Sequence, residues 1–252
     1  MLELFHSWRS TCSRRVRIAL AEKGLKYTGH PLNLLRFEHH TPEYLKLNPN
    51  GYVPTLLHDG VPYIESTVIN EYLDDVFPAP PLRPADAAAR ARMRVWTKFV
   101  DDYALPAVVV PTWSDALKKV AEKLSDAELR RRLDAIPLKE RRDRWEKIAR
   151  SAYTPQEFAE ALGKLELMMT RMDAALAHGP WLAGEAFSLA DVNIAPYVVR
   201  AGEIDPQLHD AGRWPRAMEW YARIQARQWF DQIFRTPPPV PPALFRRDPG
   251  FI

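Results

Sequence analysis

The 252-residue sequence predicts an α/β domain followed by an all-helical domain. Three observations support this division. Short apolar segments typical of strands occur within residues 1–77 and nearly vanish afterwards. The proline-rich segment 78–84 (PAPPLRP) interrupts both patterns, so it is the best candidate linker. Residues 85–235 beyond it follow mainly helical periodicity.

The first domain is expected to have the order βαβαββα. Gly24 ends its first helix, and Asp59-Gly60 favours a tight hairpin between its last two strands. In the first helix Val16, Ala19, Leu20 and Lys23 share a face, and Arg14, Arg17 and Glu22 lie largely elsewhere. The expected strands are 2–5, 26–34, 53–57 and 61–64, and the expected helices are 12–23, 41–47 and 66–77.

The second domain is expected to contain six or seven helices. Ser125 with Glu128, and Thr154 with Glu157, have the three-residue spacing of a capping box. The apolar segment 104–113 (ALPAVVVPTW) is short and broken by two prolines. The clearest helices are 85–103, 155–177, one that begins near 188, and 215–235; a charged insertion covers about 114–153, and a proline-rich tail covers 236–252.

Composition excludes several classes of protein. The net charge of +3 requires neither nucleic acid nor an anionic membrane as a partner. Cys12 is the one cysteine, so no internal disulfide forms, and no residue cluster has metal-ligand spacing. The N-terminal residues lack the pattern of a secretory signal, and no apolar run approaches the roughly 18 residues of a membrane span. We therefore expect a cytoplasmic protein without a metal.

The segment 130–150 is basic, with nine Arg or Lys against four Asp or Glu, a net +5. Such a run can bind nucleic acid. A solvated helical face is the favoured interpretation, because acidic residues are interspersed and aromatic residues are few.

Three short motifs of the first domain carry the chemistry. Ser10-Thr11-Cys12 opens the first helix, where hydroxyls, N–H groups and the helix dipole stabilise an anion, including a thiolate. The alternative is that Ser10 or Thr11 only caps the helix. The Val53-Pro54 pair at the start of a strand is compatible with a cis bond, which would let an extended peptide pair with Val53. The alternative is an ordinary edge strand.

The third motif, Glu65-Ser66, begins the last helix of this domain. Ser66 can cap that helix, and its hydroxyl and N–H can hold a carboxylate, although taken alone the motif favours a cap without a ligand. Together the three motifs offer a thiolate site, an edge that pairs with a peptide, and a carboxylate site. That combination describes a tripeptide thiol with a free α-carboxylate.

These motifs, the linker and the helical second domain resemble the cytosolic glutathione transferases along nearly the whole chain. Residues 187–198 (FSLADVNIAPYV) are similar to the family's helix-capping segment, with Ser188 as the cap and Asp191 as its partner. The resemblance implies a thioredoxin-like fold for residues 1–77, glutathione as co-substrate, and a homodimer.

Two subfamilies share the resemblance. Residues 10–24 (STCSRRVRIALAEKG) look like the zeta class, which includes maleylacetoacetate isomerases. Residues 65–78, 82–86 and 92–103, with the central charged insertion, look like bacterial glutathione-dependent β-etherases, which cleave aryl ethers.

The resemblance implies roles residue by residue. Ser10 matches the serine that stabilises the glutathione thiolate, Thr11 is the nearest alternative donor, and Cys12 occupies the zeta cysteine position. His39 and His40 lie where related classes hold the glycine carboxylate, or else in a solvated loop. The remaining implied roles are Val53-Pro54 for the cysteinyl unit, Glu65 and Ser66 for the γ-glutamyl end, and Trp8, Arg9, Tyr103 and Trp113 for an apolar, aromatic second substrate.

For four residues of the first long helix, a role in the site competes with core packing or simple exposure. Trp96 and Phe99 fit core packing better than a pocket. Asp101 and Asp102 either reach the glutathione amine or are simply exposed.

The expected reaction is nucleophilic substitution by an activated glutathione thiolate, which in a β-etherase displaces an aryloxide. The alternatives are glutathione-dependent cis–trans isomerisation, thiol transfer or reductive dehalogenation through Cys12, and a binding module without catalysis.

Overall fold

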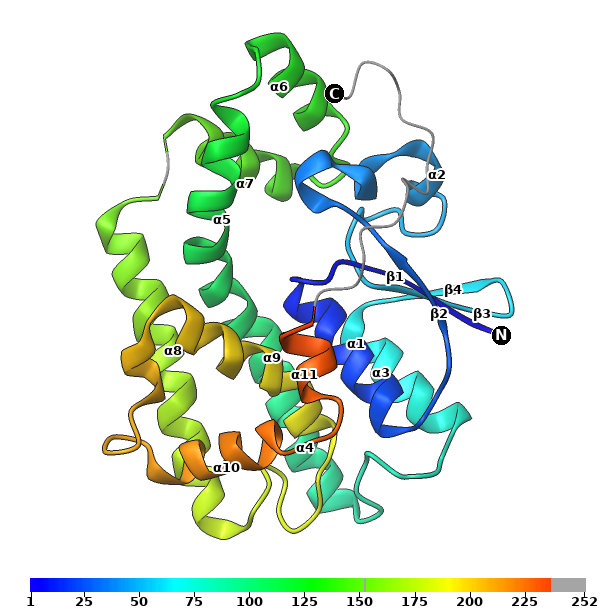
Figure 1. The fold of residues 1–252 in the computed structure, drawn as a ribbon, viewed down its shortest axis with the longest axis vertical. Helices are drawn as coiled ribbons and strands as arrows, with labels where there is room; N and C mark the ends of the chain where they lie inside the picture. Colours follow the sequence, from blue (N-terminus) through cyan, green and yellow to red (C-terminus); the bar gives the residue numbers. More distant parts are fainter. Residues whose placement is uncertain (152, 237–252) are drawn as a thin grey trace.

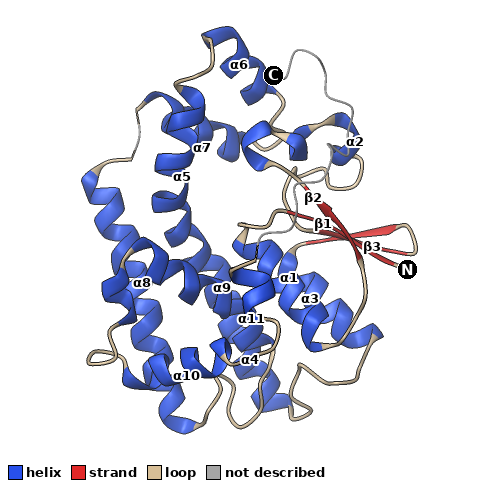
Figure 2. Cartoon of the chain, in the orientation of Figure 1, coloured by secondary structure: helices blue, strands red, loops and turns tan. Residues whose placement is uncertain are grey.

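The computed structural model describes residues 1–151 and 153–236. Its strands form one mixed sheet in the order β2-β1-β3-β4, in which β1 pairs parallel with β2 and antiparallel with β3. Figure 2 shows the strands gathered in one part of the molecule, with helices making up most of the rest. The strands are β1 (Leu2–His6), β2 (Thr28–Pro31), β3 (Thr55–His58) and β4 (Val61–Ile64).

The helices α1 and α3 lie on one side of this sheet, and α2 lies on the other (Figure 1). Two short 3-10 turns, η1 and η2, lead into α2, so the predicted order βαβαββα is confirmed. The Asp59-Gly60 hairpin is confirmed too, since both residues have the positive φ angles (49° and 81°) of a tight two-residue turn. The helical bounds are α1 (Thr11–Glu22), η1 (Leu34–Arg36), η2 (Glu38–His40), α2 (Pro42–Leu45) and α3 (Ser66–Val76).

The second part of the described chain is helical, as predicted. It has eight α-helices, one more than the upper expectation, and a π-helical segment between α4 and α5. The bounds are α4 (Ala87–Phe99), the π segment η3 (Val100–Ala104), α5 (Leu105–Ala121), α6 (Asp126–Asp134), α7 (Lys139–Arg150), α8 (Pro155–Ala175), η4 (Leu176–His178), α9 (Leu189–Ile204), η5 (Pro206–His209), α10 (Pro215–Gln225) and α11 (Phe230–Phe234).

The apolar segment 104–113 is helical despite its two prolines, because Pro106 lies in the first turn of α5, where no intrahelical donor is needed, and α5 continues through Pro111. One prediction about these helices is wrong: the expected helix 215–235 is two helices, α10 and α11. The break between them lets Arg227 and the Trp229 indole N–H both contact the Glu22 carboxylate on α1. The tail from residue 237 onwards lies outside the described residues.

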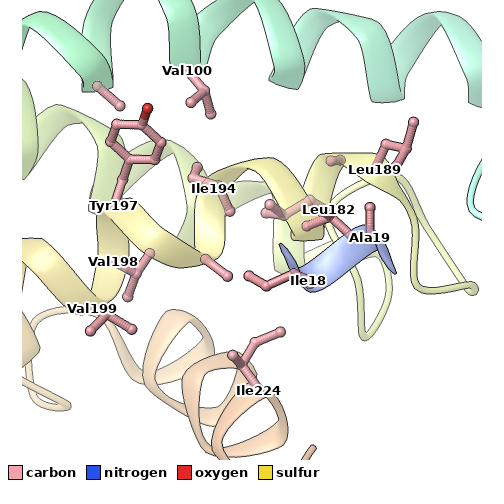
Figure 3. Packing of buried hydrophobic residues seen from close by; sticks show 14 of the residues in the cluster. Ile18, Ala19, Val100, Leu182, Leu189, Ile194, Tyr197, Val198, Val199 and Ile224 are labelled. Carbon is pink, nitrogen blue, oxygen red and sulfur yellow. The ribbon is translucent and has the colours of Figure 1, made fainter. Parts of the chain in front are cut away.

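Helix α1 is buried on nearly all sides, which differs from the single apolar face expected. Ile18 and Ala19 pack into the main core beside Ile194 and Val198 of α9 (Figure 3). The arginines of α1 are also buried: Arg14, Arg15 and Arg17 are 2%, 0% and 7% exposed. The helix that opens the predicted anion site is therefore fixed between the sheet domain and the helical domain.

Three capping boxes are confirmed: Ser125 with Glu128, Thr154 with Glu157, and Ser188 with Asp191. The third is the only one of these with a buried carboxylate. Asp191 accepts hydrogen bonds from the N–H groups of Ser188 and Leu182 at 3.0 and 3.1 Å, and from the Trp220 indole at 2.8 Å. This carboxylate therefore joins the start of α9 to α10.

We predict that Asp191→Ala lowers the free energy of unfolding by about 3 kcal/mol, because three buried N–H groups lose their acceptor. Urea titration measures the change. Asp126→Ala, at an exposed first-turn position of α6, is the control and is expected to change stability by less than about 0.5 kcal/mol. Equal effects of the two variants would contradict this account of the buried cap.

Candidate active site

The N-terminus of α1 presents the first of the predicted motifs. Ser10 is the N-cap, with extended backbone, and its hydroxyl accepts a hydrogen bond from the Ser13 N–H at 3.2 Å. Thr11 and Cys12 form the start of the first turn, and all three predicted residues are partly exposed. The first N–H groups of a helix have no partner within it and point out of its end. Ser10 is thus a helix cap, as one alternative held, at a place where an anion can also bind.

Cys12 is in contact with a buried tyrosine from the helical domain. Its sulfur lies 3.6 Å from the hydroxyl oxygen of Tyr197, on α9. Figure 3 shows Tyr197 with that hydroxyl turned towards the helical segment that carries Val100. The same hydroxyl accepts a short hydrogen bond from the guanidinium of Arg15.

Arg15 is the centre of a network that joins both domains. Its side chain is fully buried, and its Nη1 contacts the Ser66 hydroxyl at 3.3 Å and an Asp101 carboxylate oxygen at 2.6 Å. The other oxygen of Asp101 accepts a hydrogen bond from Thr67 at 2.9 Å. Four elements therefore meet at one guanidinium: α1, α3, the π segment and α9.

The electrostatics of this network keep Arg15 charged. Burial alone would lower the pKa of the guanidinium, but Tyr197, Cys12 and Asp101 outweigh it, and the pKa is raised. Burial raises the pKa of the Tyr197 hydroxyl, although Arg15 opposes the shift, so this tyrosine remains a neutral hydrogen-bond donor. The site thus holds a fixed positive charge close to the start of α1.

The α3 end of the network contains the Glu65-Ser66 motif. Ser66 does not cap the helix, which corrects one prediction: Glu65 occupies the cap position, with a φ of 67°, and makes no side-chain capping bond. Ser66 is buried as the first helical residue, and Glu65 is exposed. A positive φ is unfavourable for a residue that has a side chain. Residues with such strained backbone conformations are concentrated at ligand sites. The free N–H groups of α3 are available to a carboxylate.

Val53 and Pro54 form the third motif, and their peptide bond is cis, as the sequence allowed. They immediately precede β3, so Val53 lies just before the start of a central strand. The preceding carbonyl, of Tyr52, accepts hydrogen bonds from Tyr44 and Asn48.

His39 and His40 do not lie in a solvated loop, which corrects that alternative. They form part of η2 and are 0% and 4% exposed. Burial and Arg141 lower the pKa of His40 to about 3, with the Gly51 backbone opposing the shift, and burial with His40 lowers that of His39. Both rings are therefore neutral near pH 7.

The residues expected to contact a second substrate divide into two groups. Trp8 and Arg9 lie in the loop between β1 and α1, and the Trp8 carbonyl accepts a hydrogen bond from Arg14 at 3.1 Å. Tyr103, 43% exposed, stacks on Phe99 with ring centroids 5.2 Å apart. Of these residues, only Trp8 and Arg9 are adjacent to the Ser10 motif in the sequence.

Trp113 belongs to a separate small core. It packs against Trp145 of α7 with ring centroids 5.4 Å apart, in a cluster that includes Phe37. Trp96 and Phe99 pack on the main core, as favoured from the sequence. Asp101 joins the Arg15 network, and Asp102 forms an ion pair with Lys98 at the surface.

Neither Arg15 nor Tyr197 was predicted from the sequence as a residue of the site. The one available signal is the helical spacing that places Arg15 on the same face of α1 as Ile18 and Ala19, since a charged residue at such a position is buried only when paired. Within residues 1–151 and 153–236, no group of three or more His, Cys, Asp or Glu side chains could hold a metal ion. No helix in the same ranges is long and apolar enough to cross a membrane.

Two family models match the chain. The model for the glutathione S-transferase N-terminal domain matches residues 9–76, and that for the C-terminal domain matches residues 155–223. Neither match includes the charged insertion.

Among characterised relatives, the chain is 34% identical to protein LigF of Sphingobium sp. strain SYK-6, covering 92% of this chain and 93% of that protein. It is 49% identical to maleylacetoacetate isomerase of Pseudomonas aeruginosa over 96 residues, which cover 37% of this chain and 45% of that protein. The crystal structure of the β-etherase LigF superimposes with a TM-score of 0.85 at 33% identity, covering 92% of this chain and 98% of that one.

We predict that Arg15→Met lowers the free energy of unfolding by about 3–5 kcal/mol, because Asp101 and Tyr197 lose their buried partner. Arg92→Met, an exposed arginine of α4, is the control. Denaturant titration of both variants measures the difference. If Arg15→Met lowers the free energy of unfolding no more than Arg92→Met does, the network does not stabilise the contact between the domains.

A second prediction concerns pH. The unfolded chain protonates a histidine near pH 6.5, whereas His40 in the folded protein stays neutral down to about pH 3. Stability is therefore present above pH 6.5 and lost as the pH falls between these values, at about 1.4 kcal/mol per pH unit for this group. His40→Gln should flatten the dependence of unfolding free energy on pH by that slope, and the exposed His178→Gln should not. An unchanged slope in His40→Gln would contradict the assignment.

Proposed function

Because the chain belongs to the glutathione S-transferase family, we propose that it activates the thiol of glutathione for nucleophilic attack on an apolar electrophile. The observation that carries this proposal is the Arg15 network. It fixes the start of α1, where a thiolate would bind, against the start of α3, where a carboxylate would bind. The proposed sites for the thiolate and for the γ-glutamyl carboxylate of one ligand thereby have a fixed separation.

Glutathione is proposed to lie between these helix ends. Its γ-glutamyl carboxylate binds the N–H groups at Ser66, with Glu65 nearby for the amine, and its cysteinyl unit pairs with the backbone of Val53 ahead of Pro54. The glycine end is directed towards His39 and His40. The sulfur then lies at the first turn of α1.

The protein contributes a lowered thiol pKa and a fixed position. The helix end and the charge of Arg15 favour the thiolate, and either Ser10 or Thr11 donates a hydrogen bond to it. The thiolate forms a carbon–sulfur bond as the leaving group departs with its electron pair. Proximity and orientation supply the remaining acceleration.

For the electrophile we propose an aryl ether, in which case the leaving group is an aryloxide that takes up a proton from water. Support comes from the β-etherase LigF, which matches this chain over 92% of its length. Trp8 and Arg9, beside the Ser10 motif, are the proposed contacts for the aromatic group. Tyr103 and Trp113 contribute only if the ligand extends towards α5.

Isomerisation of a maleylacetoacetate-type substrate is the second candidate. It is favoured by the Ser10-Thr11-Cys12 motif and by the 49% identity to a maleylacetoacetate isomerase over 96 residues. In that reaction the glutathione sulfur adds to a double bond and leaves again, so glutathione is not consumed. We further propose a cytoplasmic homodimer.

A substrate panel with aryl ethers, maleylacetone and chloroaromatics separates the candidates. We expect glutathione loss matched by phenol release with an aryl ether. Turnover of maleylacetone without glutathione loss would instead support the isomerase, and failure to bind glutathione in calorimetry would rule out both. Cys12→Ser tests the route through Cys12: unchanged turnover excludes thiol transfer and reductive dehalogenation through this sulfur.

We predict that Ser10→Ala lowers kcat/KM with the best substrate by about 10²-fold, because the thiolate loses a donor. Ser125→Ala is a matched control, since it also removes an N-cap, from α6, at a cost of about 1 kcal/mol. If Thr11→Ala, not Ser10→Ala, abolishes turnover, Thr11 is the donor. Full activity in both variants would contradict activation by a hydroxyl at this helix end.

A further inference from the structure

The charged insertion contacts the sheet domain through α7. In Figure 1, α7 lies beside the segment that leads into α2, although about a hundred residues separate them in the chain. The buried residues of α7 are Arg141, Trp145 and Ile148, which share one helical face. The favoured interpretation of 130–150 as a solvated face is therefore wrong for this side of the helix.

Arg141 makes the polar part of this contact. Its Nη1 donates to the carbonyl of Gly51 at 3.1 Å, and its Nη2 lies 3.1 Å from Nε2 of His39. The guanidinium also stacks over the ring of Tyr52, 4.2 Å from the centroid. One side chain thus holds the turn at 51–52, the two residues directly ahead of Val53.

Trp145 makes the apolar part. Its ring lies 4.4 Å from that of Phe37, centroid to centroid, and Phe37 adopts a left-handed conformation between η1 and η2. Arg132 of α6 lies over the same Phe37 ring at 5.5 Å. The insertion therefore anchors both η2 and the turn that follows α2.

Gly51 permits the close approach in this region. Its φ is 61°, and a Cβ at this position would come within 2.6 Å of the His40 ring and 3.2 Å of the His39 carbonyl. The backbone at 51 is consequently packed against η2 on one side and hydrogen-bonded to Arg141 on the other. Its position, and that of Val53, depends on both neighbours.

Arg141 is 9% exposed, burial lowers its pKa, and none of its hydrogen bonds within the described residues is to a carboxylate. An arginine buried without an acid is unfavourable for stability compared with an apolar residue. Every contact described above is instead with the segment 39–52. The contacts of Arg141 with this segment therefore explain its presence better than a contribution to the stability of the fold does.

We propose that Arg141 of the insertion is a positioning residue for glutathione: it fixes the Gly51-Tyr52 turn so that Val53 presents its backbone to the cysteinyl unit. This inference rests on the proposed function, since it assumes that glutathione pairs with Val53. The insertion, which both family models leave outside, thereby becomes part of the glutathione site without touching the reacting sulfur.

The test compares Arg141→Met, Arg141→Lys and the exposed Arg144→Met, which loses the same charge one turn further along α7. Calorimetry gives the affinity of each for glutathione and for γ-glutamylcysteine, which lacks glycine. We expect Arg141→Met to bind both ligands at least about tenfold more weakly, with kcat at saturating glutathione within about threefold of wild type. Arg141→Lys has one ammonium in place of the two guanidinium N–H donors, so its affinity for both ligands should be intermediate. The affinity of Arg144→Met should be unchanged.

Each other outcome overturns the inference. Wild-type affinity in Arg141→Met would show that the turn needs no support from α7. A loss confined to glutathione, with γ-glutamylcysteine unaffected, would assign Arg141 to direct contact with the glycine carboxylate. Parallel loss of kcat and of folded protein would assign it a structural role, and if Arg141→Met does not fold, Arg141→Lys decides by the same criteria. Failure of the wild type to bind glutathione would instead contradict the proposed function.

Discussion

The burial of Arg15 is the constraint on which the rest of this structure depends. A guanidinium without access to water needs partners of complementary charge or dipole, and a single helix cannot supply them. Here they come from α3, the π segment and α9, through Ser66, Asp101 and Tyr197. These contacts hold the sheet domain and the helical domain together at α1. They also set the distance between the helix ends proposed to bind the thiolate and the γ-glutamyl carboxylate of glutathione.

The domains meet again at α7. There the contacts are those of Arg141 and Trp145 with the segment from Phe37 to Tyr52. The first junction orders the ends of α1 and α3, and the second orders the turn ahead of Val53. A ligand that contacts all three motifs would therefore bind to a backbone held from both sides, which reduces the ordering that binding itself must produce.

The order of strands and helices was predictable because its signals are local. Asp59-Gly60 specifies a hairpin, Ser188 with Asp191 specifies a helix start, and Val53-Pro54 marks the start of a strand, each within a few residues. Ser10, Val53 and Ser66 were predicted as site residues from local signals of this kind. Arg15 and Arg141 were not, because their partners lie up to 182 and 102 residues away in the chain. Helical periodicity assigned α1 a single apolar face, and only the packing of α9 and α11 reveals that its arginines are buried. The split between α10 and α11 was missed for a similar reason, since the residues at the break, Arg227 and Trp229, contact Glu22, about 200 residues earlier in the chain.

The sulfur and the γ-glutamyl carboxylate of one glutathione molecule are proposed to bind at a single site joined by Arg15. A crystal structure with bound glutathione tests this proposal. We expect the sulfur within hydrogen-bonding distance of the first turn of α1, the cysteinyl backbone paired with Val53, and the carboxylate on the N–H groups that open α3. Glutathione bound elsewhere, or with its sulfur directed away from Ser10, Thr11 and Cys12, would contradict the account.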